Sequence, residues 1–347
     1  MFGNLRFGYW TLIALSFLYF GMASIFGNSA LSRMVSFSGW KTLFPIWVLP
    51  GLIWFGIVAV ELAKRRVDRP TITMLRLASL HRSWLFRGLL FTAMAIPIAQ
   101  SFGSFKVAIP NLVPFYADHY FVAADHLIFG TDPWRLTHAI FGPVGTLVID
   151  RVYAAWFFAV MVLLGWLNFT HNQKLQLRGL LSYLLALALV GNGLAIAFSS
   201  VGPCFFEEFY GDDRFHELMT RMRETNEVHT ILALKAMNYL LSSFGTEKFG
   251  SGISAMPSLH VSMAFLCFLV SLESTKRLWP KLLTGAFAAT IMVGSVHLGW
   301  HYAVDGIAGI LGVTLIWIAA GRFVDWVEAR HSKNQPAPPH LIRLEPA

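Results

Sequence analysis

The sequence predicts an all-α protein that crosses a membrane about eight times. Its 347 residues are 56% hydrophobic and only 13% charged, with a mean hydropathy of +0.57. Soluble domains carry about 25% charged residues, so this chain has too few charges to cover a water-soluble globule of its size. The composition therefore excludes a soluble cytosolic enzyme, a disordered chain and a disulfide-stabilised scaffold.

Eight apolar runs support this prediction, because a membrane-spanning helix needs about 17–25 residues. They are Tyr9–Gly27, Leu43–Ala63, Trp84–Ser104, Leu147–Phe169, Gly179–Ser200, Ser258–Leu272, Leu282–Leu298 and Tyr302–Gly321. The sixth and seventh runs are short, which leaves room for functional helix ends at the membrane surface. We expect the first run to be a retained helix, because its uncharged stretch is too long for the apolar part of a signal peptide.

The distribution of charges predicts the orientation of these helices. With the N-terminus inside, the inside segments hold 17 of the 27 Lys and Arg residues but only 6 of the 19 Asp and Glu residues. This bias predicts that both termini are cytoplasmic, and it explains the net charge of +8 without nucleic acid. Short loops and the absence of targeting signals favour a bacterial inner membrane; a eukaryotic secretory membrane is the alternative.

This topology divides the chain into three parts. Residues 1–80 hold the first two runs and a basic cytoplasmic loop, residues 81–330 form a six-helix core, and residues 331–347 form a disordered tail. Two long loops, 105–146 and 201–257, face outside. Within the second loop, residues 213–244 have the pattern of an amphipathic helix that either lies in the membrane interface or caps the bundle.

The residues that carry chemistry gather at the outer ends of three runs. Ser258 and His260 open the sixth run, and His301 and Asp305 open the eighth. A spacing of four residues places His301 and Asp305 on one helix face, and a carboxylate that orients an imidazole raises its basicity. A first helical turn, where Ser258 and His260 lie, has free N–H groups that favour an anion. We therefore predict a periplasmic site that binds a phosphate and uses a histidine as nucleophile or general base.

Simpler interpretations stay open for these residues. In these interpretations the His301–Asp305 pair only stabilises the contact between two helices, and Ser258 only caps its helix. A metal site is a weaker alternative, whose ligands would be His260, His297, His301 and Asp305. The chain must reverse direction after His297, so this residue need not share a face with His301. We expect no metal and no other cofactor, and we assign His297 a contact with the substrate.

Two segments, 255–260 (AMPSLH) and 298–305 (LGWHYAVD), resemble the histidine motifs of the type 2 phosphatidic acid phosphatase superfamily. They are most similar to those of its inositol phosphorylceramide synthase branch, an inositolphosphotransferase-like group. The resemblance covers roughly the last 100 residues and implies a helical, phosphatase-like membrane core that needs no metal. It also implies that His301 forms a phosphohistidine, that Asp305 orients it and that His260 protonates the leaving group. It implies that Ser258 binds phosphate oxygens, and the segment with Gly202 and Pro203 resembles a small-residue and proline motif of that branch. The predicted contacts to substrate or phosphate are thus Ser258, Gly202 and Pro203, together with Ser295 and His297 next to the second histidine motif.

The chain departs from the superfamily pattern where phosphate-binding cations are expected. The nearest match to the first motif, residues 64–70, has the wrong spacing and lies on the cytoplasmic side. Gly294 and Ser295 stand where the third motif usually has Ser-Arg, so that arginine is missing. A cation must still stabilise the phosphate, and the sequence does not choose among the outer candidates. These are Arg135, Arg151, Arg214, Arg221, Arg223, Lys235 and Lys248.

The resemblance thus implies a lipid phosphotransferase that moves a phosphoryl headgroup between phospholipid or sphingolipid substrates at the outer leaflet. A phosphatase acting on phosphatidic acid or a polyprenyl phosphate is the alternative within the class. A transporter or flippase with a His–Asp proton relay is a weaker alternative, because its ionisable groups would lie near the bilayer midplane. The expected partners are lipid substrates and the bilayer, without nucleic acid, and the oligomeric state stays open.

Overall fold

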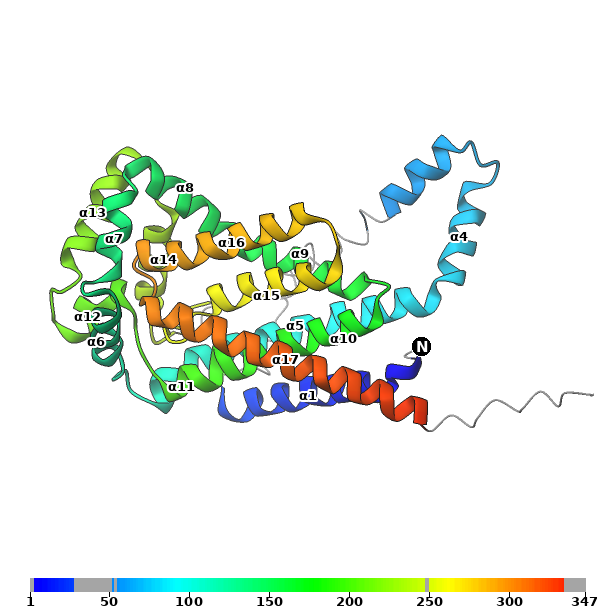
Figure 1. Cartoon of the computed structure of the whole chain (residues 1–347), viewed down its shortest axis with the longest axis horizontal. Coiled ribbons are helices and arrows are strands. Elements are labelled where there is room, and N and C mark those ends of the chain that lie inside the picture. Colours follow the sequence, from blue (N-terminus) through cyan, green and yellow to red (C-terminus); the bar gives the residue numbers. More distant parts are fainter. Residues whose placement is uncertain (1–2, 28–51, 53–54, 247–249, 334–347) are drawn as a thin grey trace, which may run out of the picture.

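The computed structural model describes residues 3–27, 52, 55–246 and 250–333, and these residues form helices and loops without a β-strand. Long helices run side by side along the longest axis of the molecule, and short helices cover one end of them (Figure 1). This arrangement confirms the predicted all-α fold.

The long helices form an up-and-down bundle. Its members are α1 (Arg6–Phe26), α5 (Arg82–Leu112), α8 (Pro143–Ala154), α9 (Trp156–Phe169), α10 (Gln173–Leu185), α15 (Leu259–Ser274), α16 (Leu278–His297) and α17 (Ala303–Lys333). A 3-10 turn, η1 (Gly3–Leu5), precedes α1, and α10 continues through the π-helical η2 (Ala186–Leu194) into α11 (Ala195–Ala197). Since α15 packs against both α16 and α17, the ends of these three helices are close neighbours.

Five helical stretches are long and apolar enough to cross a membrane: Gly3–Phe26, Arg82–Leu112, Pro143–Phe169, Gln173–Ala197 and Ala303–Ser332. They correspond to the first, third, fourth, fifth and eighth predicted runs and confirm an integral membrane protein. The sixth run is the shorter α15, with 16 residues. The seventh is α16, which has 20 residues and is not among the five. The second run lies largely outside the described residues.

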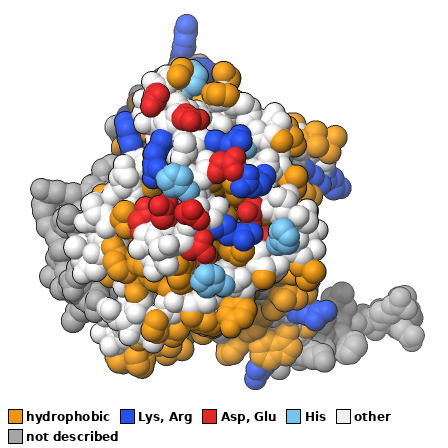
Figure 2. All heavy atoms as spheres, turned by 90° about the vertical axis from the view of Figure 1, so that its left-hand side faces the viewer, with side chains coloured by type: hydrophobic (Ala, Val, Ile, Leu, Met, Phe, Trp, Pro, Cys, Tyr) orange, Lys and Arg blue, Asp and Glu red, His pale blue; other side chains and the backbone are white. Residues whose placement is uncertain are grey.

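Short helices cap the end of the bundle at the left of Figure 1. Two of them, α6 (Asp118–Phe129) and α7 (Pro133–Ile140), follow α5. The others follow α11: η3 (Pro203–Phe205), α12 (Phe206–Tyr210), α13 (His216–Val228) and α14 (Leu232–Ser242). Seen end-on, the cap carries acidic, basic and histidine side chains, while hydrophobic side chains gather toward its edges (Figure 2). This polarity fits a cap at a membrane surface.

The other end of the molecule holds both ends of the described chain. There η1 packs against α17, and α4 (Pro70–Leu80) and the helical residues 55–64 extend outward (Figure 1). The first three residues of the predicted tail, 331–333, belong to α17, and the rest of the tail lies outside the described residues. Residues 3 and 333 therefore lie on one side of the bundle, and the cytoplasmic assignment of that side stays a prediction.

The region 213–244, predicted as one amphipathic helix, contains two helices, α13 and α14. The chain is extended between them, and the buried Asp150 carboxylate accepts hydrogen bonds from the first two N–H groups of α14 at 2.9 and 2.8 Å. A carboxylate in this position starts a new helix. Leu218 and Met222 of α13 are fully buried, so the apolar face of α13 packs against the rest of the protein.

A buried aspartate joins the cap to the bundle. The carboxylate of Asp118, at the start of α6, accepts hydrogen bonds from the backbone N–H groups of Val201 and Gly202 over 2.8–3.2 Å. It also accepts bonds from the hydroxyls of Tyr210 and Tyr302 at 2.8 and 2.9 Å. Tyr302 directly follows one of the predicted site histidines, so this carboxylate fixes the loop that carries that histidine.

Replacing Asp118 with alanine is expected to destabilise this end of the protein. The change removes the acceptor for buried N–H and hydroxyl groups, at a cost of about 1–3 kcal/mol for each group left unpaired. The melting temperature of the purified variant in detergent should fall by several degrees. Asp213→Ala, at an exposed position of the same cap, should leave it unchanged, and equal melting temperatures for the two variants would contradict this role of Asp118.

Candidate active site

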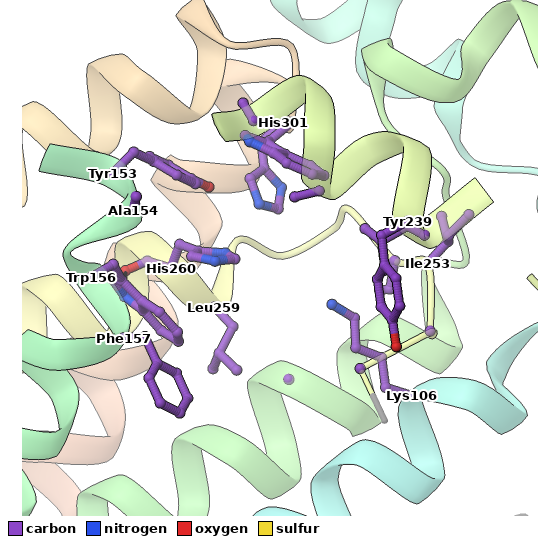
Figure 3. A pocket seen from close by; sticks show the side chains of 18 of the residues that line it. Lys106, Tyr153, Ala154, Trp156, Phe157, Tyr239, Ile253, Leu259, His260 and His301 are labelled. Atoms are coloured by element: carbon purple, nitrogen blue, oxygen red, sulfur yellow. Dashed lines mark hydrogen bonds between the residues drawn. The ribbon is translucent and has the colours of Figure 1, made fainter. Parts of the chain in front are cut away.

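His260 and His301 face each other across one cavity beneath the cap. The cavity has a volume of about 460 Å³, and both histidines form part of its wall. The centres of their rings are 6.0 Å apart. Figure 3 shows both imidazoles directed into the same space, His260 from the first turn of α15 and His301 from the turn between α16 and α17. The structure thus brings together two residues that are far apart in the sequence.

Aromatic rings and a helix cap hold His260 in place. Its imidazole stacks on Tyr153 with ring centres 5.0 Å apart, and it lies against Trp156 at 4.3 Å. The indole N–H of Trp156 donates to the carbonyl oxygen of His260 at 2.8 Å. Ser258 caps α15, since its hydroxyl accepts a hydrogen bond from the Val261 N–H at 3.3 Å. The predicted helix start is therefore confirmed.

Asp305 lies behind His301, as the spacing predicts. Its Oδ2 is 3.4 Å from His301 Nδ1, slightly longer than a formed N–H···O bond, and it also accepts a hydrogen bond from the Tyr302 N–H at 3.1 Å. The exposed fraction is 6% for His301 and 0% for Asp305. Because α17 begins at Ala303, His301 precedes the helix and does not share its first turn. The carboxylate still faces Nδ1, which leaves Nε2 for chemistry.

A second aspartate fixes the start of α17. Asp125 of α6 accepts hydrogen bonds from the N–H groups of Ala303 and Val304 at 2.8 and 2.9 Å. The first N–H groups of a helix have no partner within it, so this carboxylate acts as a cap supplied by another element. Asp125 thereby holds the turn that carries His301 against the short helices that cover this end of the bundle.

The ring of His301 is neutral at neutral pH. Burial of the imidazole is the main reason that the pKa of His301 falls to about 3. The Lys106 ammonium also lowers this pKa, while a backbone hydrogen bond with Ala255 acts in the opposite direction. A neutral imidazole keeps the lone pair that a nucleophile needs.

The other five predicted contacts do not border the cavity, and three of them are polar side chains with partners elsewhere. Ser258 and Ser295 are fully buried, and the Ser295 hydroxyl donates to a carbonyl of its own helix at 2.8 Å. The ring of His297 stacks on His138 with centres 3.9 Å apart and contacts threonine hydroxyls of α7 and α8. These contacts give all three residues structural partners, and their roles in substrate binding stay predictions.

Gly202 and Pro203 lie where two loops of the site cross. Gly202 has a φ of +88°, and a Cβ at this position would lie 2.6 Å from the carbonyl oxygen of Trp300. Only glycine tolerates both the left-handed backbone and this close approach. Gly202 therefore allows the loop after α11 to pack against the loop of His301, while Pro203 begins η3.

Lys106 also borders the cavity, although the sequence analysis did not select it. The predicted third run ends at Ser104, whereas α5 continues to Leu112, so Lys106 lies on the helix. Its ammonium group points into the cavity (Figure 3). The sequence feature that could have identified Lys106 is a single lysine in an apolar stretch. An ionisable residue in a membrane helix is costly and usually functional.

Comparison with known proteins gives one match. A family model described as the PAP2 superfamily matches residues 135–319, just over half of the chain. The matched region contains His260, His301 and Asp305, but not Lys106. No curated protein and no solved structure matches the chain.

The low pKa of His301 predicts an unusual pH dependence. With a donor whose own charge does not change between pH 4.5 and 8, kcat/KM should show no loss as the pH falls from 7 to 5, because His301 stays unprotonated. A nucleophilic histidine with an ordinary pKa of about 6.5 would lose roughly 30-fold over that range. A fall in kcat/KM at acidic pH, with its midpoint near pH 6.5, would show that His301 titrates normally or is not the nucleophile.

Proposed function

This chain belongs to the PAP2 superfamily of phosphatases and phosphotransferases, and from that premise we propose that it is a lipid phosphotransferase. In the proposed reaction a phosphoryl headgroup moves from one lipid to the hydroxyl group of another through a phosphohistidine at His301. One observation carries the proposal: His260 and His301 lie on opposite sides of one cavity, with the buried Asp305 behind His301.

In the first step, Nε2 of His301 attacks the phosphorus atom of the donor while the bond from phosphorus to the lipid oxygen breaks. Binding of the anionic donor favours protonation of the nearby His260. The His260 imidazolium then gives this proton to that oxygen, so that an alcohol leaves instead of an alkoxide. Asp305 faces Nδ1 and stabilises the positive charge that develops on the His301 ring. The cavity that both rings border, about 460 Å³ in volume, has space for a tetrahedral phosphoryl group.

In the second step, a hydroxyl group of the acceptor gives its proton to His260, which is now neutral. The acceptor oxygen attacks phosphorus as the bond to Nε2 breaks, so His301 ends neutral and His260 ends protonated. Water in place of the alcohol would give hydrolysis, which is the phosphatase alternative. The apolar wall formed by Phe102, Phe157 and Leu240 suits the chains of a lipid donor and of a lipid acceptor.

The proposal extends to the location of the reaction and to its substrates. The cavity is lined by α14 of the cap together with His260 and His301. The cap lies at the opposite end of the bundle from residues 3 and 333 (Figure 1), and the positive-inside bias favours the outer leaflet for that end. Residues 81–330 would form the catalytic core, to which residues 1–80 add α1, packed against α5, α10 and α17. The resemblance to inositol phosphorylceramide synthases supports phospholipid or sphingolipid substrates.

Replacing His301 with alanine should abolish transfer, because the nucleophile is lost, and kcat/KM should fall by at least about 1000-fold. Asp305→Asn keeps the shape of the side chain but removes its charge, and it should lower kcat/KM by about 10- to 100-fold. The assay follows a labelled headgroup from a phospholipid donor to ceramide or diacylglycerol in detergent micelles, and it also measures release of the headgroup into water.

His126→Ala, on the exposed surface of α6, is the matched control and should keep the wild-type rate. Turnover by H301A at the wild-type rate would overturn the proposed function. Release of the headgroup into water, without transfer to any of the alcohols offered, would assign the phosphatase alternative.

A further inference from the structure

The basic residues that the sequence offers as phosphate ligands do not border the cavity in the part of the chain that the structure describes. Arg223 and Lys235 are exposed on α13 and α14, and Lys248 lies outside the described residues. The other four form ion pairs with carboxylates: Arg135 and Arg221 with Glu217, Arg214 with Asp132, and Arg151 with Asp150. A phosphate in the cavity therefore needs a different counter-charge.

Lys106 lies where that counter-charge is needed. In Figure 3 its ammonium group points into the space between Tyr239 and the two histidines. No carboxylate among the described residues pairs with it. Asp150 also borders the cavity, but its oxygens already accept hydrogen bonds from α14 and from Arg151. An ammonium group in a largely apolar cavity, without a counter-ion, attracts an anionic ligand.

The loop that leads to His260 also positions Lys106. A Cβ at Gly252 would lie 2.6–2.8 Å from the carbonyl carbon, carbonyl oxygen and Cγ of Lys106. Real Cβ atoms do not approach other atoms so closely, so only glycine permits this contact. The same loop continues to Pro257 and into α15. One short segment therefore sets the positions of both the lysine and the histidine.

Two uncharged donors also border the cavity. The hydroxyl of Tyr153 and the indole N–H of Trp300 are buried and have no hydrogen-bond partner among the described residues. Tyr153 is 8% exposed, and its hydroxyl points into the space that His260 and His301 share (Figure 3). A buried polar group without a partner is costly, so these two donors mark the place of a ligand with acceptor oxygens.

We propose that Lys106 binds the phosphate of the donor, with Tyr153 and Trp300 donating to its other oxygens, and that this set selects a phosphodiester over a phosphomonoester. The Lys106 ammonium contributes one positive charge to the cavity. This charge matches a diester, which carries one negative charge. A monoester carries about −1.5 to −2 at neutral pH, and its additional buried charge would lack a partner. This inference rests on the proposed function and adds the cation and the charge of the donor.

The test compares wild type, K106Q and K106R by the release of diacylglycerol in detergent micelles that also contain ceramide as the acceptor alcohol. The donors are phosphatidylglycerol and phosphatidylinositol as diesters and phosphatidic acid as the monoester. Wild type should prefer one of the diesters by at least about 10-fold in kcat/KM, because one buried charge is left uncompensated with the monoester. K106Q should lower kcat/KM for that diester by about 100-fold, and K106R should retain more activity because it keeps the charge.

Lys276→Gln, at an exposed position at the other end of α15, is the matched control, and melting temperatures check that each variant folds. A wild-type kcat/KM for K106Q would overturn the role of Lys106. So would a loss of kcat/KM in Lys248→Gln, measured alongside, without a loss in K106Q. Faster release from phosphatidic acid than from either diester would overturn the selectivity. H301A at the wild-type rate, or no release from any donor, would overturn the proposed function itself, whereas an inactive H301A beside a fully active K106Q would overturn this inference alone.

Discussion

Buried carboxylates at the capped end of the bundle satisfy the loop N–H groups on which the site depends. Backbone donors shielded from water at a membrane surface must find their partners within the protein. Asp118 supplies an acceptor for the loop after α11, and Asp125 supplies one for the first turn of α17. Both carboxylates anchor segments next to His301. The position of the proposed nucleophile therefore follows from two acidic side chains that take no part in the chemistry.

The electrostatics of the cavity favour a neutral nucleophile beside a positive phosphate ligand. Burial and the Lys106 ammonium both lower the pKa of His301, so the group that would attract the anionic donor also keeps the imidazole unprotonated. The Asp305 carboxylate faces Nδ1 of the same ring, and it would stabilise the positive charge that develops on the ring during attack. Cationic and anionic side chains on either side of one imidazole thus serve different stages of the proposed reaction.

The sequence predicted the features that depend on local pattern. Apolar runs located five membrane spans, because the length and hydropathy of a helix are properties of contiguous residues. Short contiguous motifs also identified His260, His301 and Asp305 in advance. The cavity depends on contacts between distant segments, and these could not be predicted. Lys106 enters it because α5 extends past the predicted end of its run and Gly252 packs on its backbone.

The residue roles inferred from the family motifs agree less well with the structure than the roles inferred from side-chain geometry. Ser258, Ser295 and His297 lie in or beside the motifs, yet their polar groups have partners within the protein. Tyr153 belongs to no motif, and its hydroxyl is directed into the cavity and has no hydrogen-bond partner in the described part of the chain. Spacing along the chain identifies which residues can act together, but the direction of each side chain depends on its packing.

The central claim, that His301 becomes covalently phosphorylated, is tested most directly by trapping the intermediate. Wild-type enzyme is mixed with a donor labelled in its headgroup phosphate, quenched in alkali during turnover, and digested. A phosphohistidine survives alkali and is hydrolysed by acid. The account predicts an acid-labile label on the peptide that contains His301, and none on the same peptide from H301A. A label on a different residue, or no label during demonstrated turnover, would contradict it.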